Sequence, residues 1–448
     1  MKRTLLFLLA ILPTMLLAQH TIKGTFTPPE AFKFAFLYRV TEKTAVFVAN
    51  ADVDENGKFE IKLGSEAIPG TYRLVYAQPQ EKNNFDLFYS GKEDVELNFD
   101  AEKGLSFVSS LDNKLYTSYT KSIALVNQSI RNYYSKQTDD KEGYARIFEI
   151  LTRTQNEFEA AAKGTLALDF IKACKPYIPS DYEDVTTFSK NVKANYFKNI
   201  DFSNKALQKS NFLIKNTVSY VFNFIDRNNK NNSYIANVDT AVKAIGDNPE
   251  IKKVLLEILW NQFAEEENEV AANYITTTYL SDLAKAEKDD ELLATISAFK
   301  NASIGNVAPN FSFETTDKKG KSVSKKLSEL DASENYLIFF WSTVCSHCLD
   351  EIPQLKEYIA SKNKEQIQVI AIALDNDQYR WKNMTYDFPD FIHVYGEGKW
   401  ENAIGNAYNV SATPSYFVLD KDKKITAKPY DIDAFKSYFS KISSENKE

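Results

Sequence analysis

The chain has 448 residues, more than one hydrophobic core usually organises, so we expect two or three domains. Its formal net charge of −7 argues against nucleic acid and anionic membranes as partners. Three cysteines in so long a chain are too few for a structural disulfide framework.

The N-terminus has the three parts of a secretory signal peptide. Lys2 and Arg3 supply positive charge, residues 5–17 are apolar, and the small residue Ala18 stands at the expected cleavage position. The apolar stretch is shorter than the roughly 20 residues that span a bilayer, and no later stretch is long enough. We therefore expect residues 1–18 to be removed, leaving a periplasmic protein without stable membrane insertion.

Residues 19–105 alternate between apolar and polar side chains, which is typical of half-buried strands. The alternation is clearest over residues 58–63, 72–76 and 95–99. Residues 54–57 (Asp-Glu-Asn-Gly) are a turn signal between two strands. This pattern predicts an N-terminal antiparallel β-sandwich, in which nothing points to catalysis.

Residues 106–302 change to the period of helices, so we predict an α-helical middle domain. Polar turns, including residues 227–233, separate the helices, and Cys174 is expected to be a small apolar residue of a helical core. The predicted helices cover residues 112–134, 143–162, 206–225, 250–263 and 268–286.

Residues 303–448 have a different design, which begins after the glycine, asparagine and proline of residues 303–310. Two continuous apolar strands on either side of a helix form the βαβ pattern of a parallel sheet, and an antiparallel pair follows. The predicted elements are the strand 336–341, the helix 348–361, the strand 369–374 and the pair 416–419 and 424–427.

Two cysteines, Cys345 and Cys348, lie where the strand 336–341 passes into the helix. At this spacing two thiols can form a disulfide and open it again by thiol-disulfide exchange. Cys345 would lie at the helix N-terminus, where backbone N–H groups and the helix dipole favour a thiolate, and His347 could add positive charge. We therefore expect Cys345 to attack and the more sheltered Cys348 to resolve the mixed disulfide.

Thr413 and Pro414 precede the predicted strand 416–419. A proline just before a strand is a candidate for a cis bond, which would leave the Thr413 backbone free to pair with an extended substrate segment. The base rate for proline favours the trans form, so the residues alone leave both isomers open.

Five motifs occur in one order along the C-terminal region: residues 305–311 (Gly-Asn-Val-Ala-Pro-Asn-Phe), 340–341 (Phe-Trp), 345–348 (Cys-Ser-His-Cys), 351–353 (Glu-Ile-Pro) and 413–414 (Thr-Pro). Together they resemble the thioredoxin fold, and within it the TlpA/ResA-like periplasmic thiol-disulfide oxidoreductases. Residues 20–105 resemble, less specifically, the β-domain that precedes such modules in Bacteroidetes proteins. The helical middle resembles no family that we can assign.

The resemblance implies roles for the residues of the redox helix. Cys345 would be the nucleophile and Cys348 the resolving thiol. Glu351, three residues after Cys348, would lie near the thiols and tune their proton affinity, although its position alone favours a solvated helix residue. Pro353 would kink the helix because it removes one backbone donor.

The resemblance also implies how the site meets its partners. Pro414 would be cis, and Thr413, Pro414 and Trp341 would bind the substrate. The partners would be protein thiols and disulfides, with a membrane thiol donor that restores the dithiol, and no cofactor would be needed. The substrate stays open, whether an apocytochrome in cytochrome c maturation, another oxidoreductase, or misoxidised proteins in an antioxidant role.

Two departures from the family bear on the direction of electron flow. Many relatives carry tryptophan where this chain has Val344, and proline where it has His347. A histidine between the cysteines should stabilise the thiolate and make the disulfide a stronger oxidant. The resemblance favours a reductant, so the two arguments oppose each other.

Metal or haem binding is the first alternative, because cysteine and histidine also ligate zinc and iron. A structural zinc site needs about four ligands, yet only Cys345, His347 and Cys348 cluster in the sequence. The c-type haem signature needs histidine directly after the second cysteine, where this chain has Leu349.

Two further alternatives are a peroxiredoxin-like thiol peroxidase and a redox-inert ligand-binding protein. The peroxidase group shares the fold and the motif at residues 308–311, but its nucleophile normally follows a threonine three residues earlier and a proline further back. Those positions hold Ser342 and Ile338. The intact cysteine pair opposes a redox-inert module.

Overall fold

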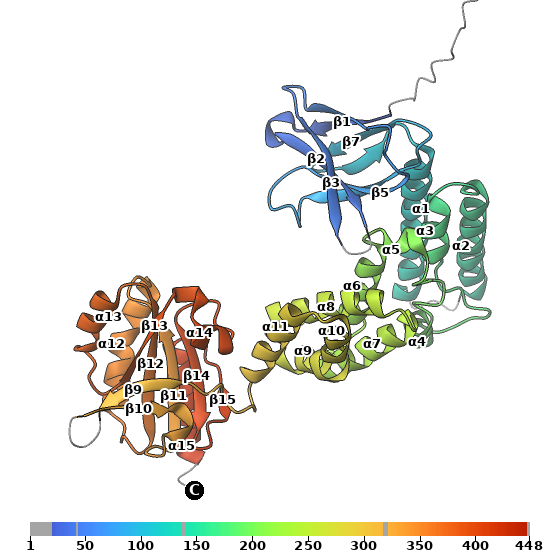
Figure 1. Ribbon diagram of the computed structural model, residues 1–448. Helices are drawn as coiled ribbons and strands as arrows, with labels where there is room; N and C mark the ends of the chain where they lie inside the picture. Colours follow the sequence, from blue (N-terminus) through green and yellow to red (C-terminus); the bar gives the residue numbers. More distant parts are fainter. Residues whose placement is uncertain (1–19, 42–43, 137–139, 317–320, 446–448) are drawn as a thin grey trace, which may run out of the picture. The chain divides into compact units, whose positions relative to one another are not determined.

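The computed structural model (Figure 1) describes residues 20–41, 44–136, 140–316 and 321–445. The predicted signal peptide lies outside these residues. The chain forms two compact units, Met1–Leu255 and Leu256–Glu448. This division differs from the predicted domain borders after residues 105 and 302, which stay predictions.

The first unit begins with two four-stranded sheets whose inner faces share one core, including Phe26, Leu37, Tyr72 and Leu97. The predicted β-sandwich is confirmed, with one difference. Neighbouring strands are antiparallel except β1 and β7, which are far apart in sequence and pair in parallel. The first sheet is β4 (Lys58–Lys62), β1 (Thr21–Thr27), β7 (Val95–Asp100) and β8 (Gly104–Phe107); the second is β3 (Ala45–Asp52), β2 (Phe34–Val40), β5 (Gly70–Val75) and β6 (Asn84–Tyr89).

Helices follow the strands, which confirms the predicted helical middle. The predicted helix 206–225 is broken, because the Ser210 hydroxyl donates to the carbonyl oxygen of Leu207 and accepts from the N–H of Phe212. The polar run 227–233, predicted as a turn, already contains the start of α7. The helices are α1 (Leu111–Ser135), α2 (Lys141–Ala161), α3 (Ala167–Ala173), α4 (Val185–Ala194), α5 (Lys205–Gln208), α6 (Phe212–Asn223), α7 (Lys230–Ile245) and α8 (Pro249–Glu265).

The predicted helix 268–286 contains a π-helical turn that its periodicity does not reveal. At this turn the Thr276 hydroxyl donates to the Ala272 carbonyl oxygen and accepts from the indole N–H of Trp260. Single π turns of this kind interrupt α-helices without ending them. The elements are α9 (Glu269–Ile275), the π turn η2 (Thr276–Leu280), α10 (Ser281–Glu287) and α11 (Asp290–Asn301).

A five-stranded sheet of order β13-β12-β11-β14-β15 forms the centre of the C-terminal region, as the βαβ pattern predicted. β11, β12 and β13 are parallel, whereas β14 runs antiparallel to β11. The C-terminal ends of three strands and the N-terminal end of β14 therefore lie at one edge. The strands are β11 (Asn335–Trp341), β12 (Ile367–Asp375), β13 (Ile392–Glu397), β14 (Ser415–Asp420) and β15 (Ile425–Ala427), beside the hairpin β9 (Ser312–Thr316) and β10 (Ser322–Lys326).

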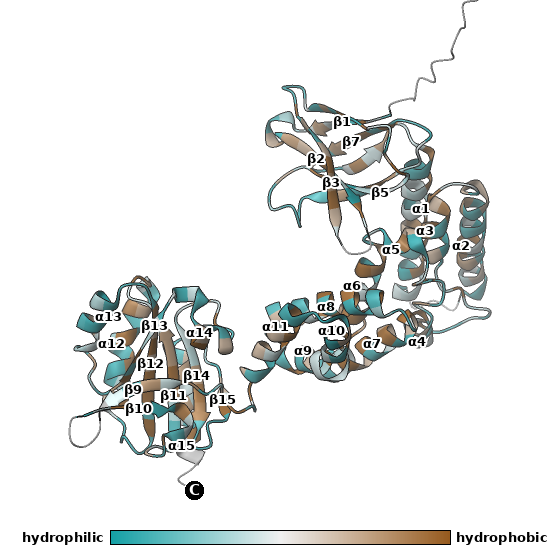
Figure 2. Cartoon of the chain, in the orientation of Figure 1, coloured by the Kyte–Doolittle hydropathy of each residue, from teal (hydrophilic) through white to brown (hydrophobic). Residues whose placement is uncertain are grey.

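Both faces of this sheet are covered, and Figure 2 shows its central strands as strongly hydrophobic. On one face Leu355 and Phe435 pack from two helices, and on the other Phe311 and Tyr408 pack against Phe340. Among the described residues, no helix is both long and apolar enough to cross a bilayer. The helices of this region are α12 (Ser346–Ala360), α13 (Gln378–Thr385), α14 (Ala403–Ala407) and α15 (Ile432–Glu445).

Candidate active site

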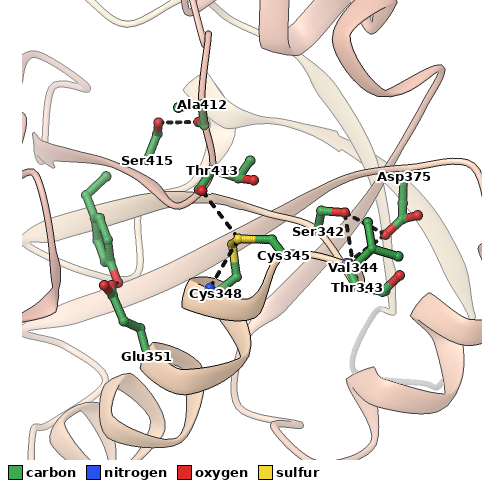
Figure 3. The surroundings of a disulfide bond; sticks show 11 residues. Ser342, Thr343, Val344, Cys345, Cys348, Glu351, Asp375, Ala412, Thr413 and Ser415 are labelled. Atoms are coloured by element: carbon green, nitrogen blue, oxygen red, sulfur yellow. Dashed lines mark hydrogen bonds between the residues drawn. A yellow bond between two sulfur atoms is a disulfide. The ribbon is translucent and has the colours of Figure 1, made fainter.

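The redox pair lies between β11 and α12 (Figure 3), where Cys345 and Cys348 form a disulfide with Cα atoms 5.3 Å apart. α12 begins here because Cys345 is its N-cap: the Cys348 N–H donates to Cys345 Sγ at 3.2 Å, and the Leu349 N–H donates to the Cys345 carbonyl oxygen at 3.1 Å. The sulfur of Cys345 thus accepts a backbone hydrogen bond at a helix N-terminus. This arrangement stabilises negative charge on the sulfur once the disulfide is reduced.

The two sulfurs differ in access, as the helix position predicted. The Cys345 side chain is half-buried, whereas Cys348 is completely buried and packs with Ile352 and Leu355 in the core. An external thiol or disulfide can therefore reach Cys345 but not Cys348.

The loop before β14 lies against the accessible sulfur. The Thr413-Pro414 peptide bond is cis, and Cys345 Sγ lies 3.3 Å from the Thr413 carbonyl oxygen. In the disulfide this sulfur carries no hydrogen, so the contact is a packing contact; in the reduced protein the thiol can donate to the same oxygen. The Ser415 hydroxyl donates to the Ala412 carbonyl oxygen at 2.7 Å and closes the loop.

Glu351 lies one turn after Cys348 on α12 and is not a freely solvated side chain. It is half-buried and accepts a hydrogen bond from the hydroxyl of Tyr416 on β14. Tyr416 is only 2% exposed and packs against Phe339 and Phe435. Burial, followed by the bond to Glu351, raises the pKa of the Tyr416 phenol, which therefore stays a hydrogen-bond donor.

Asp375, at the end of β12, is a second carboxylate of the site and lies beside the turn that leads into Cys345. It is 2% exposed and accepts hydrogen bonds from the backbone N–H of Thr343 at 2.7 Å and from the Ser342 hydroxyl at 3.2 Å (Figure 3). Its other oxygen accepts from the Asn376 N–H at 3.0 Å. Asp375 thus fastens the end of β12 to the turn that leads into Cys345.

The other predicted residues lie around this centre in different settings. His347 is exposed on the first turn of α12, and Val344 is 62% exposed. Trp341 is completely buried against Phe388, so its side chain is not offered directly to a substrate. Pro353 lies inside α12. In the described part of the chain, no three His, Cys, Asp or Glu side chains lie close enough to hold a metal ion.

Sequence reasoning missed Tyr416, Asp375 and Ser342. Weak signals were present, since Asp375 is the first charged residue after the apolar strand 369–374, and Tyr416 follows Pro414 by two residues. Neither signal points to the redox pair without the strand order that brings β12 and β14 to either side of β11.

The third cysteine, Cys174, lies at the C-terminal end of α3 and packs against the helical core of the first unit. Its sulfur is 3.9 Å from the Tyr116 hydroxyl oxygen. Burial raises the pKa of the Cys174 thiol to about 11. This setting agrees with the predicted role as a small apolar residue.

Residues 303–440 match a family model described as Redoxin. The chain is 31% identical over 125 residues to the thiol-disulfide oxidoreductase ResA of Bacillus cereus, covering 28% of this chain and 68% of the relative. It is 25% identical over 122 residues to ResA of Geobacillus kaustophilus, covering 27% of this chain and 66% of the relative. The matched part thus spans about two thirds of the ResA length.

Two solved structures are also similar. A thioredoxin-like protein from Bacteroides caccae aligns with a TM-score of 0.39 and 17% identity, over 59% of this chain and 96% of its own. A domain of a possible thiol-disulfide isomerase from Cytophaga hutchinsonii aligns with a TM-score of 0.27 and 26% identity, over 32% and 96%. The ResA match, the Redoxin match and the Cys345-Cys348 pair place the chain, through its C-terminal region, in the ResA-like thiol-disulfide oxidoreductases of the thioredoxin superfamily.

Proposed function

We propose that this protein is a periplasmic reductant that opens disulfides of protein substrates through Cys345 and Cys348. The asymmetry of the pair carries the exchange mechanism, and the reducing direction rests on the family resemblance: Cys345 is accessible and its sulfur accepts a backbone hydrogen bond, whereas Cys348 is completely buried. An accessible thiolate can attack a substrate, and a sheltered thiol one turn away completes the exchange inside the protein.

The exchange has two steps, each of which breaks one S–S bond and forms another. The Cys345 thiolate attacks a substrate disulfide, forms a mixed disulfide and releases the first substrate thiolate. Cys348 then loses its proton and attacks Cys345 Sγ, which restores the internal disulfide and releases the second substrate thiol. Two electrons pass to the substrate, and a dithiol donor must return them.

The residues around the pair have supporting roles in this proposal. Glu351, oriented by Tyr416, exchanges a proton with the buried Cys348, because a carboxylate is an acid-base group one helical turn away. His347, exposed on the first turn of α12, adds positive charge near Cys345 when it is protonated. Thr413 and Pro414 present backbone to an extended substrate, and Trp341, buried in the core against which Cys345 packs, acts on the site only indirectly.

The proposed location rests on the N-terminal residues, and the proposed electron donor rests on that location. Residues 1–18 have the charge, apolar stretch and small final residue of an export signal, and the exported compartment is oxidising. A pair that reduces others there is not kept reduced by a cytosolic thiol pool, so we propose a membrane thiol donor.

We also propose a division into residues 19–105, 106–302 and 303–448. The division is supported by the change from strands to helices between β8 and α1, and by the Redoxin match, which begins at residue 303.

Trapping experiments with three variants of the full chain test the mechanism. Cys348→Ala should accumulate a mixed disulfide between Cys345 and a disulfide-bonded substrate such as insulin, seen on non-reducing gels. Cys345→Ala should reduce no substrate, and Cys174→Ala is the matched control that should behave as the unaltered protein. Substrate reduction by Cys345→Ala would refute the assignment.

The reduction potential tests the direction of electron flow. A value near that of thioredoxin, about −270 mV, would support a reductant, whereas a value near that of DsbA, about −120 mV, would overturn that part of the proposal. Equilibration with glutathione buffers of known ratio gives this value.

A further inference from the structure

Asp375 is the buried carboxylate that the proposed exchange does not use. Burial raises the pKa of its side chain, but hydrogen bonds from Thr343, Asn376 and Ser342 outweigh burial and hold the pKa below its usual range. The side chain therefore carries a negative charge at neutral pH. Among the described residues, no lysine, arginine or histidine forms an ion pair with it.

The carboxylate braces the turn that delivers the nucleophile. Ser342 and Thr343 are held directly by Asp375. The Ser342 hydroxyl also accepts from the Val344 N–H at 3.4 Å, and its carbonyl oxygen accepts from the Cys345 N–H at 3.2 Å. Hydrogen bonds thus hold the first two residues of the turn and close it at Cys345. They set the position of the Cys345 sulfur at the N-terminus of α12.

The negative charge of Asp375 also affects the ionisation of the Cys345 thiol. The charged or titratable groups near the pair include His347, which is exposed, Glu351, which is bonded to the neutral phenol of Tyr416, and Asp431, which interacts electrostatically with Tyr416. Glu397 lies opposite Asp375 on β13, and Tyr395 interacts electrostatically with Asp375, Asp377 and Glu397. Water screens His347, whereas Asp375 is buried, where charges are screened least. A fixed negative charge there disfavours a second negative charge on Cys345.

We propose that Asp375 is a positioning residue of the redox pair and that its fixed charge favours the disulfide over the thiolate form, which makes the pair a stronger electron donor. This inference rests on the proposed function, because it concerns the direction in which the same pair passes electrons. Reduction of the disulfide takes two electrons and two protons, or one proton where Cys345 stays a thiolate. A charge that disfavours the thiolate therefore disfavours the reduced form.

Asp375→Asn in the full chain tests the charge, because the amide keeps the shape and its oxygen can still accept from the Thr343 N–H and the Ser342 hydroxyl; the Asn376 N–H alone loses its acceptor. The probe is equilibration with reduced and oxidised glutathione at pH 7. We expect the equilibrium to shift about tenfold towards the dithiol, which corresponds to about 30 mV. Asp377→Asn is the matched control, since Asp377 is exposed on the following loop, and should stay within twofold. A shift below twofold for Asp375→Asn, or a shift towards the disulfide, would overturn the proposal.

Ser342→Ala tests the brace separately, because it removes the hydroxyl and keeps the charge. Exchange should slow severalfold while the glutathione equilibrium stays within twofold. An unchanged rate would overturn the positioning role.

The unaltered protein supplies a measurement that does not depend on a variant folding. If Asp375 disfavours the thiolate, the two groups interact electrostatically, so in the reduced protein the carboxyl carbon resonance of Asp375 should shift as Cys345 ionises, at a pH well above the pKa of Asp375 itself. The oxidised protein should show no such step, and absence of the step in the reduced protein overturns the charge role of Asp375. Absence of any reversible disulfide in the unaltered protein would instead overturn the proposed function.

Discussion

Cys345 and Cys174 lie at opposite kinds of helix end, and their surroundings differ accordingly. Cys345 caps the N-terminus of α12, where the Cys348 N–H points at its sulfur. Cys174 follows the last residue of α3, where carbonyl oxygens point outwards and apolar side chains pack around the thiol. One end favours a thiolate and the other a neutral thiol, so the same side chain serves chemistry at one site and packing at the other.

The largest expected effect is a difference in alkylation between these two thiols in the reduced protein. With the pKa of Cys174 at about 11, only about one Cys174 thiol in ten thousand is ionised at pH 7. Iodoacetamide should label Cys345 at least about a thousandfold faster, as measured by peptide mass spectrometry. Labelling of Cys174 should rise about tenfold for each pH unit until the pH reaches its pKa. Equal labelling rates of Cys345 and Cys174 at pH 7 would contradict the expected difference between the two thiols.

The polar neighbours of the redox pair are tested by Tyr416→Phe, which leaves the Glu351 carboxylate without its donor. We expect the free energy of unfolding to fall by about 1 to 2 kcal/mol, and the pH profile of exchange to change. Tyr408→Phe is a matched control, because it removes a buried bond to the Pro309 carbonyl oxygen in the core on the other sheet face. It should cost similar stability in urea unfolding and leave the exchange profile unchanged. A changed profile in both variants would count against a specific role of Tyr416.

The capping role of Cys345 gives a smaller effect. Cys345→Ser keeps an acceptor for the Cys348 N–H, whereas Cys345→Ala removes it, and neither variant can form the disulfide. The serine variant should be about 1 kcal/mol more stable in urea unfolding, while both lack exchange activity. Equal stabilities would show that the sulfur contributes nothing as an N-cap.

The smallest effect is expected for Cys174→Ala. The loss of one small, partly buried side chain should lower the free energy of unfolding by less than about 1 kcal/mol, with unchanged exchange. A tenfold fall in exchange rate, measured by insulin reduction, would show that Cys174 takes part in the chemistry after all.

The accuracy of the sequence predictions depends on how local the interactions are. Strong periodicity placed α1 and β12 within two residues at each end. Periodicity did not reveal the break at Ser210 or the π turn at Thr276, because single hydroxyl groups redirect backbone bonds there without changing the apolar pattern. The polar run 227–233 was likewise predicted as a turn, although α7 begins within it at Lys230.

The residues of the candidate site also fall into those that local sequence predicts and those that depend on the strand order. Cys345, Cys348 and His347 are neighbours in sequence, so helix position alone predicted which sulfur is sheltered. Asp375 and Tyr416 reach the pair from other strands, and only the strand order brings them there. The cis form of Thr413-Pro414 came from family resemblance, because proline statistics favour trans.

The burial of Cys348 restricts the line along which the disulfide can be opened. Substitution at sulfur needs the attacking atom, the central sulfur and the leaving sulfur close to one axis, and the far side of that axis is filled by the core around Cys348. A donor thiolate must therefore approach Cys345 from solvent and expel Cys348 as an anion into an apolar interior. Such an anion is costly until it is protonated. Each reduction of the disulfide by the donor thus requires that a proton reach Cys348 inside the core. Because the donor contacts only Cys345, this proton must arrive by a separate route.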